Sequence, residues 1–237
     1  MPNLNFQITG VEPADRGLTP LLQFKLRIES AEAAAPAQIQ GLLLAAQIQI
    51  HAPQRTYNAR EKAKLIELFG TPERWGHTLR NRLWAHTQAT VSAFTGQTEA
   101  LLPVPCTFDL NVAATKYFYA LDSGEVPLLF LFSGSVFYIA PDGRLQVERI
   151  SWNKECVYRI PARLWHELMQ RHYPNAAWLY LQRDVFDRLC AYKRQQGLAT
   201  WEETIETLLT PTDSEEHRPE AIAAHQSRSP QLAEARA

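Results

Sequence analysis

The sequence predicts an α+β protein, in which an antiparallel β-sandwich carries a helical insertion and is followed by a C-terminal helical part. Apolar and polar residues alternate at 22–29, and a long run rich in aromatic and β-branched residues follows at 125–139. Turn signals such as Pro141-Asp142-Gly143 separate the short strands. Parallel strands would need a helix between successive strands, and that rhythm is absent, so the sheets are predicted to be antiparallel.

The sandwich is predicted to span residues 1–160. In 22–29, Leu, Phe, Leu and Ile alternate with Gln, Lys, Arg and Glu, which places the apolar set on one face of a half-buried strand. A second strand at 39–50 ends in the same alternation. The run 125–139 is predicted to be buried on both faces, and the glycine within it indicates a bulge or bend. Further strands are predicted at 83–94, 98–104, 106–112, 115–121 and 145–150.

The helical insertion is predicted at 58–80. Asn58 can cap a helix, with Glu61 three residues later as its capping-box partner. Gly70 is the expected stop, and Pro72 is well placed to start a second short helix. The apolar face of the first helix is expected to hold Ala63, Leu65, Ile66 and Phe69.

The C-terminal part is predicted to be helical over 161–210 and packed on the sandwich. One helix opens at Pro161, a second is capped by Asp184, and Thr200 with Glu203 forms another capping box. The remaining segment, 211–237, lacks aromatic residues and periodicity, so it is predicted to be a disordered tail.

Charge, cysteine count and hydropathy argue against several classes of protein. The 24 basic and 25 acidic residues give a net charge of -1, so we expect no nucleic-acid partner. Three widely spaced cysteines suit reduced thiols rather than a disulfide framework. The first residues lack the pattern of a signal peptide, and no apolar run is long enough for a membrane span. We therefore expect a cytoplasmic protein.

Motif analysis predicts no catalytic, metal-binding or cofactor-binding residue. His166-Glu167 would need a second histidine four residues after the first to form a zinc site on one helix face, but position 170 is glutamine. Cys106 could act as a nucleophile if His51, His77 or His86 lay beside it. A packed, inert thiol is the more frequent role of a free cysteine.

The notable basic cluster lies in the second half of the insertion. Arginines and a histidine surround a tryptophan that the sequence indicates is exposed, and this composition is enriched at protein interfaces. We therefore predict a partner-binding surface on the insertion from Asn58 to Trp84 and on the exposed sheet edge. Its named residues are Arg74, Trp75, His77, Arg80 and Arg82.

Five blocks of the sequence, at 68–79, 102–109, 116–121, 127–134 and 160–165, resemble a bacterial family of unknown function, DUF6084. Members of that family are often encoded near genes for high-affinity [NiFe] uptake hydrogenases. The resemblance implies an accessory role in making, assembling or docking such an enzyme, with a hydrogenase subunit or maturation factor as partner. A looser similarity is to the SecB-type export chaperones, which are also cytosolic antiparallel-sheet proteins with C-terminal helices.

The function predicted from the sequence is thus a non-catalytic, protein-binding accessory factor. Three alternatives stay open: a cysteine-dependent enzyme that uses Cys106 and a histidine, a SecB-like cytosolic chaperone, and a metal carrier with scattered His and Cys side chains as ligands.

Overall fold

The computed structural model describes residues 2–14, 17–31 and 38–210. The predicted tail at 211–237 lies outside these residues. Contacts divide the described residues into two compact units, one up to Trp178 and one from Leu179 onward. None of the described helices is long and apolar enough to cross a bilayer.

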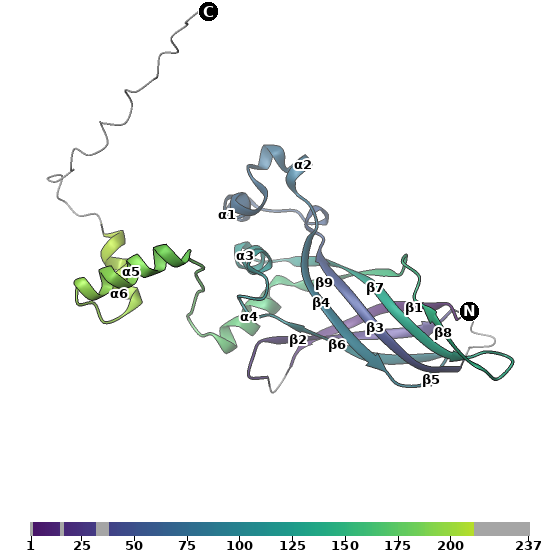
Figure 1. Cartoon of the computed structure of the whole chain (residues 1–237). Helices are drawn as coiled ribbons and strands as arrows, with labels where there is room; N and C mark the ends of the chain where they lie inside the picture. The colour runs from purple at the N-terminus through teal and green to yellow at the C-terminus, as the bar shows by residue number, and fades with distance from the viewer. Residues whose placement is uncertain (1, 15–16, 32–37, 211–237) are drawn as a thin grey trace, which may run out of the picture. The chain divides into compact units, whose positions relative to one another are not determined.

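The first unit contains two antiparallel sheets, as the sequence predicts (Figure 1). Sheet A has the strand order β1-β2-β6, formed by Leu4–Pro13, Leu21–Ser30 and Gln97–Pro105. Sheet B has the order β4-β3-β7-β8, in which β9 also pairs with β7 and β5 with β3. Its strands are β3 (Gln38–Ile50), β4 (Arg82–Val91), β5 (Phe94–Thr95), β7 (Glu125–Ile139), β8 (Leu145–Arg149) and β9 (Glu155–Pro161).

The core lies between the sheets because each strand turns alternate side chains inward. In β2, the residues Leu22, Phe24, Leu26 and Ile28 are fully buried, as the alternation predicts. The Phe24 ring packs edge-on against Phe130 of β7, with 5.1 Å between ring centroids. The fold class predicted from periodicity is therefore confirmed.

Strand β7 differs from the prediction of burial on both faces. Val126, Leu128, Phe130 and Phe132 point into the core, whereas the intervening Leu129 and Leu131 are half-buried. The outer face of sheet B is therefore apolar and yet partly open to solvent.

The segments 106–112 and 115–121, for which the sequence predicts strands, are not strands in the structure. Residues Val112–Ala120 form helix α3, preceded by turns. Asn111 caps this helix by accepting a hydrogen bond from the Ala114 N–H (3.0 Å). Ala114, Tyr117 and Phe118 recur at helical spacing and are buried, so the aromatic residues belong to a helix face. The strand predicted at 83–94 is also divided, into β4 and β5.

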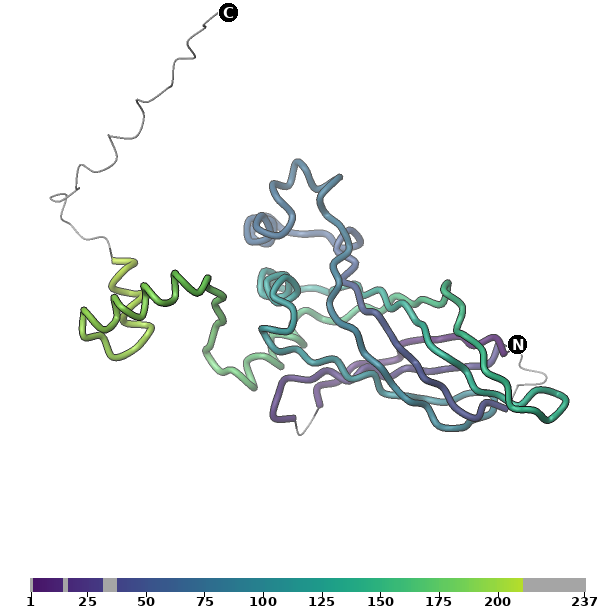
Figure 2. The backbone as a smooth tube through the Cα atoms, viewed as in Figure 1, coloured from purple at the N-terminus to yellow at the C-terminus, as the bar shows by residue number. Residues whose placement is uncertain are grey.

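The helices of the first unit gather beyond one end of the strands (Figure 1). The insertion leaves the end of β3 and returns to the start of β4 (Figure 2). It contains a short 3-10 turn η1 (Ala52–Gln54), helix α1 (Ala59–Phe69), a second turn η2 (Pro72–Arg74) and helix α2 (Trp75–Thr78). Helix α4 (Ala162–His172) contacts α3 and β9.

The second unit contains helices α5 (Arg183–Gln195) and α6 (Trp201–Leu209). The predicted capping box of α6 is present, because the Thr200 hydroxyl accepts from the Glu203 N–H (3.1 Å) and the Glu203 carboxylate accepts from the Thr200 N–H (3.2 Å). Phe186 of α5 contacts Trp201 of α6. The predicted packing of these two helices on the sandwich stays a prediction.

Candidate protein-binding site on the helical insertion

Local sequence signals fix the first helix of the insertion. The Asn58 side chain accepts from the Glu61 N–H (2.8 Å), and the Glu61 carboxylate accepts from the Asn58 N–H (3.1 Å). Gly70 ends the helix at a φ of 74°, in the left-handed region that favours glycine. The buried face differs from the prediction, because Leu65 and Phe69 are buried whereas Ala63 and Ile66 are exposed.

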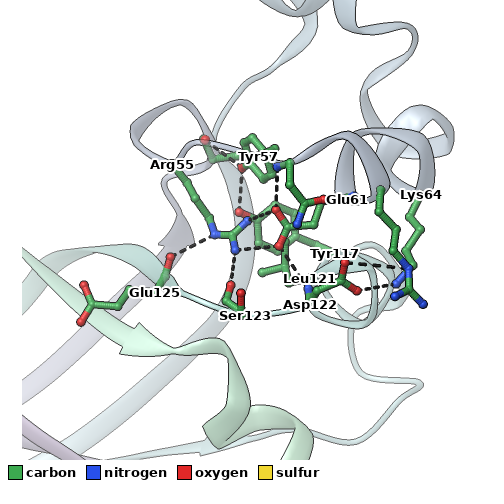
Figure 3. A network of polar contacts seen from close by, with 12 residues as sticks. Arg55, Tyr57, Glu61, Lys64, Tyr117, Leu121, Asp122, Ser123 and Glu125 are labelled. Atoms are coloured by element: carbon green, nitrogen blue, oxygen red, sulfur yellow. Dashed lines mark hydrogen bonds and ion pairs between the residues drawn. The ribbon is translucent and has the colours of Figure 1, made fainter.

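The first position of that buried face is Glu61, a charged residue that is paired (Figure 3). Two nitrogens of the Arg55 guanidinium donate to its two carboxylate oxygens, at 3.1 and 2.9 Å. The Asp122 N–H also donates to Glu61 (3.1 Å). Burial raises the pKa of the Glu61 carboxyl, but hydrogen bonds from Arg55 and the backbone more than offset this, so the pKa is lowered.

The same arginine ties the insertion to the segment that leads into β7. Its guanidinium donates to the backbone carbonyls of Ser123 and Glu125, the latter at 3.0 Å. Lys64 of α1 contributes an ion pair to Asp122 (2.9 Å), and this pair lowers the pKa of the Asp122 carboxyl. The insertion is therefore held to the sandwich by charge-assisted hydrogen bonds at several points.

A pair of tyrosines extends this polar network into the core (Figure 3). The hydroxyls of Tyr57 and Tyr117 lie 2.8 Å apart, and Tyr57 donates to the Ala52 carbonyl (2.9 Å). Burial raises the pKa of both phenols, so they remain neutral hydrogen-bonding groups.

Two of the five predicted partner-binding residues are anchors of the insertion. Trp75 is half-buried, not exposed: its indole N–H donates to the Gly70 carbonyl (2.9 Å) and its ring packs edge-on against Tyr57 and Phe69. The guanidinium of Arg82 donates to the Leu68 carbonyl and lies over the Phe69 ring.

The other three predicted residues, Arg74, His77 and Arg80, are exposed. They lie on or directly after η2 and α2, the segment that Trp75 and Arg82 hold in place. Among the described residues, no carboxylate forms an ion pair with these three side chains. They consequently form a small basic surface on an ordered platform, available to an acidic partner.

Sequence patterns give no signal for Arg55, which anchors α1, or for Tyr117, which contacts Tyr57 and Phe69. The Asn58–Glu61 capping box was a signal for Glu61, but it indicated a helix start and gave no sign of a buried ion pair. Arg55 lies in a short connection, and its partners Ser123 and Glu125 follow about 70 residues later in the chain.

The environment of Cys106 disfavours catalysis by this residue. The side chain is buried, and its Sγ donates to the Val104 carbonyl (3.4 Å). Burial raises the pKa of the thiol to about 12, so the nucleophilic thiolate is scarce at neutral pH. Within the described residues, no hydrogen bond joins a histidine to this thiol, and no group of three His, Cys, Asp or Glu side chains is arranged to hold a metal.

The geometry defines a two-sheet antiparallel protein with an anchored, basic helical insertion. A family model matches residues 1–217, and the chain belongs to that family, the family of unknown function DUF6084. No curated protein matches the chain.

Several solved structures show weak similarity to this chain. One is a protein described as late embryogenesis abundant, at 9% identity over 68% of this chain and 72% of that chain, with a TM-score of 0.30. The β-glucosidase of Kluyveromyces marxianus shares 9% identity over 67% of this chain, which spans 15% of the enzyme, with a TM-score of 0.26. β-Glucosidase 3B of Thermotoga neapolitana shares 11% identity over 67% of this chain and 17% of the enzyme, with a TM-score of 0.24. These scores are too low to support a statement about function.

Proposed function

We propose that this protein is a non-catalytic accessory factor that binds a protein partner through the basic surface formed by Arg74, His77 and Arg80. The observation that supports the proposal is that the insertion has two kinds of residue, buried ones that anchor it and exposed ones that do not. Its buried apolar residues and the buried Arg55–Glu61 pair are used for anchoring, whereas the side chains of Arg74, His77 and Arg80 are exposed without a carboxylate partner among the described residues. A preordered charged surface loses little conformational entropy on binding and attracts a partner of opposite charge.

The proposed partner is a subunit or maturation factor of a [NiFe] hydrogenase, and the proposed place of action is the cytoplasm. The support for this part is the family membership, together with the expectation that members of the family are encoded near [NiFe]-hydrogenase genes. The basic surface adds a physical requirement: the matching surface of the partner should be acidic.

The proposal can be tested by affinity purification of the tagged full chain from its native host under hydrogen-oxidising growth, followed by mass spectrometry. We expect hydrogenase subunits or maturation factors in stoichiometric amounts with the wild type. A variant with Arg74→Ala, His77→Ala and Arg80→Ala should recover at least tenfold less, because all three replaced side chains are exposed and the anchors remain.

A matched control replaces two exposed arginines of α4, with Arg163→Ala and Arg171→Ala. It should retain the partner, since the loss of positive charge is similar but lies elsewhere. Recovery that falls equally in both variants would refute a specific role for the insertion, and a wild type that elutes without a partner would refute the accessory function.

A further inference from the structure

Strand β8 lies at an open edge of sheet B (Figure 1). It pairs with β7, and among the described residues no strand pairs with its other edge. The Ala140 N–H donates to the Arg144 carbonyl (2.9 Å), and the Ile150 N–H donates to the Gly134 carbonyl (3.0 Å). Hydrogen-bonded pairs alternate along an antiparallel ladder, so Leu145, Val147 and Arg149 direct their N–H and C=O groups toward the open edge.

Strand β8 turns three side chains to the outer face of the sheet, of which Leu145 and Val147 are apolar and Arg149 is charged, and all three are exposed. Leu145 is 59% exposed and Val147 is 55% exposed. They stand opposite Ile139 and Phe137 of β7, on the face that turns away from the core. An edge strand with unpaired backbone groups and exposed apolar side chains is a template for another strand, and β8 contains neither proline nor lysine to prevent such pairing.

We propose that a second copy of this chain pairs with this edge, β8 against β8 in antiparallel orientation, about a two-fold axis at Val147. In this register Val147 faces Val147 of the second copy, Leu145 faces Arg149, and Gln146 faces Glu148. No like charges stand opposite each other, and the Gln146 amide can donate to the facing carboxylate. The N–H groups directed to the edge, three from each copy, all find carbonyl partners in the other strand.

Pairing with a second copy suits the side chains of β8 and also satisfies its open backbone N–H and C=O groups. An unrelated strand could satisfy the same N–H and C=O groups, but the register of β8 against itself also brings Val147 against Val147 and Gln146 against Glu148, without a like-charge pair. The two-fold axis also places the apolar residues of both copies next to each other, so Leu145 and Val147 lose solvent exposure in each subunit. A closed, isologous dimer follows, with no open edge left at β8 for further growth.

The test is the mass of the full chain in solution, measured by sedimentation equilibrium over a range of concentrations. One chain has a mass of 27.0 kDa, and we expect the wild type to approach twice that value as its concentration rises. Val147→Lys and Val147→Glu should each remain at the mass of one chain, because like charges would meet at the axis. An equimolar mixture of these two variants should regain the doubled mass, since Lys then faces Glu.

Val157→Lys is the matched control for this experiment. Val157 is 56% exposed on the same outer face, but it lies in β9, so the substitution should leave the dimer intact. Far-UV circular dichroism confirms that each variant is folded. The proposal is overturned if the wild type keeps the mass of one chain throughout, if Val157→Lys dissociates the dimer as fully as Val147→Lys does, or if the mixed variants do not associate.

Disulfide trapping supplies a second measurement that does not depend on a destabilising charge. Facing residues of a hydrogen-bonded antiparallel pair have Cα atoms about 5.5 Å apart, which suits a disulfide. Val147→Cys should therefore give a covalent dimer on mild oxidation, whereas Val157→Cys and the wild type should not. Equal cross-linking at both positions would contradict the edge pairing. The basic surface at Arg74 is unchanged in all these variants, so failure here is distinguishable from failure of the proposed function.

Discussion

The buried ion pair of the insertion gives a sharp prediction through the substitution Glu61→Gln. The side chains of Arg55 and Glu61 are 7% and 3% exposed, and two direct hydrogen bonds join them. Glutamine keeps the volume and can still serve in a capping box, so the substitution chiefly removes the charge and leaves Arg55 without its counter-ion. Breaking a buried pair in this way costs about 3–5 kcal/mol, and we expect about 3 because several backbone contacts remain.

The assay is amide hydrogen exchange of α1, since the insertion can open without the sandwich. A loss of 3 kcal/mol corresponds to an opening constant about 10²-fold larger, and protection of α1 should fall by that factor. Glu67→Gln on the same helix is the control. Its ion pair with Lys116 has side chains that are 68% and 45% exposed, so its loss should cost at most about 0.5 kcal/mol.

The difference in α1 stability between the wild type and Glu61→Gln depends on pH, and the direction of this dependence follows from the pKa of Glu61. The pKa of the Glu61 carboxyl is lowered from its ordinary value of 4.5 in the folded protein, so its ionised form stabilises the fold. The stabilisation is complete above pH 4.5 and is lost as the pH falls through the lowered pKa. The gap between wild type and Glu61→Gln should therefore be constant near pH 7 and close in acid. Equal protection of α1 in the Glu61→Gln and Glu67→Gln variants at pH 7 would refute the reasoning.

Three further predictions concern stability and reactivity. Gly134→Ala should destabilise the protein by about 2 kcal/mol or more in urea unfolding, because the φ of Gly134 is 138° and an added Cβ would lie 2.0 Å from the Leu43 carbonyl oxygen. Gly41→Ala is the control: its added Cβ would make only ordinary van der Waals contact, so it should cost about 1 kcal/mol or less. Trp75→Ala should destabilise the insertion by about 2 kcal/mol, as measured by amide hydrogen exchange of α1. Arg74→Ala should change the stability of the insertion by less than about 0.5 kcal/mol in the same assay. Cys106 should react with a thiol reagent at pH 8 much more slowly than the other two cysteines, as measured by peptide mass spectrometry, and equal rates would contradict its burial.

The elements that the sequence predicts well are those with local signals. Residues 22–29 of β2 alternate strictly, and α1 has both a capping box and a terminal glycine, so periodicity and end signals agree. The missed strand β1 carries the same alternation, with Leu4, Phe6 and Ile8 buried, and this pattern could have been recognised. Local patterns predict these strands and this helix because the apolar residues of each recur with the period of the element and form a single face that can be buried.

Helix α3 shows where such reasoning fails. Its residues include Val, Thr and three aromatic side chains, which favour strands on average. The deciding features are the Asn111 cap and the packing of Tyr117 and Phe118 against residues far away in the sequence, including Trp165. Propensity is a weak prior, and tertiary packing overrides it here.

The basic cluster of the insertion shows that composition alone also cannot separate residues that bind a partner from residues that stabilise the fold. Composition alone groups Trp75 and Arg82 with Arg74, His77 and Arg80, because all five belong to residue types found at interfaces. The structure separates them by their contacts: an indole N–H and a guanidinium that donate to main-chain carbonyls serve the fold, and cations without such acceptors remain available for binding. The two roles depend on each other, because exposed charges attract a partner productively only when their positions are fixed before the encounter. The residues that fix them, Trp75 and Arg82 directly and the Arg55–Glu61 pair at the start of the insertion, are therefore expected to influence partner binding without touching the partner.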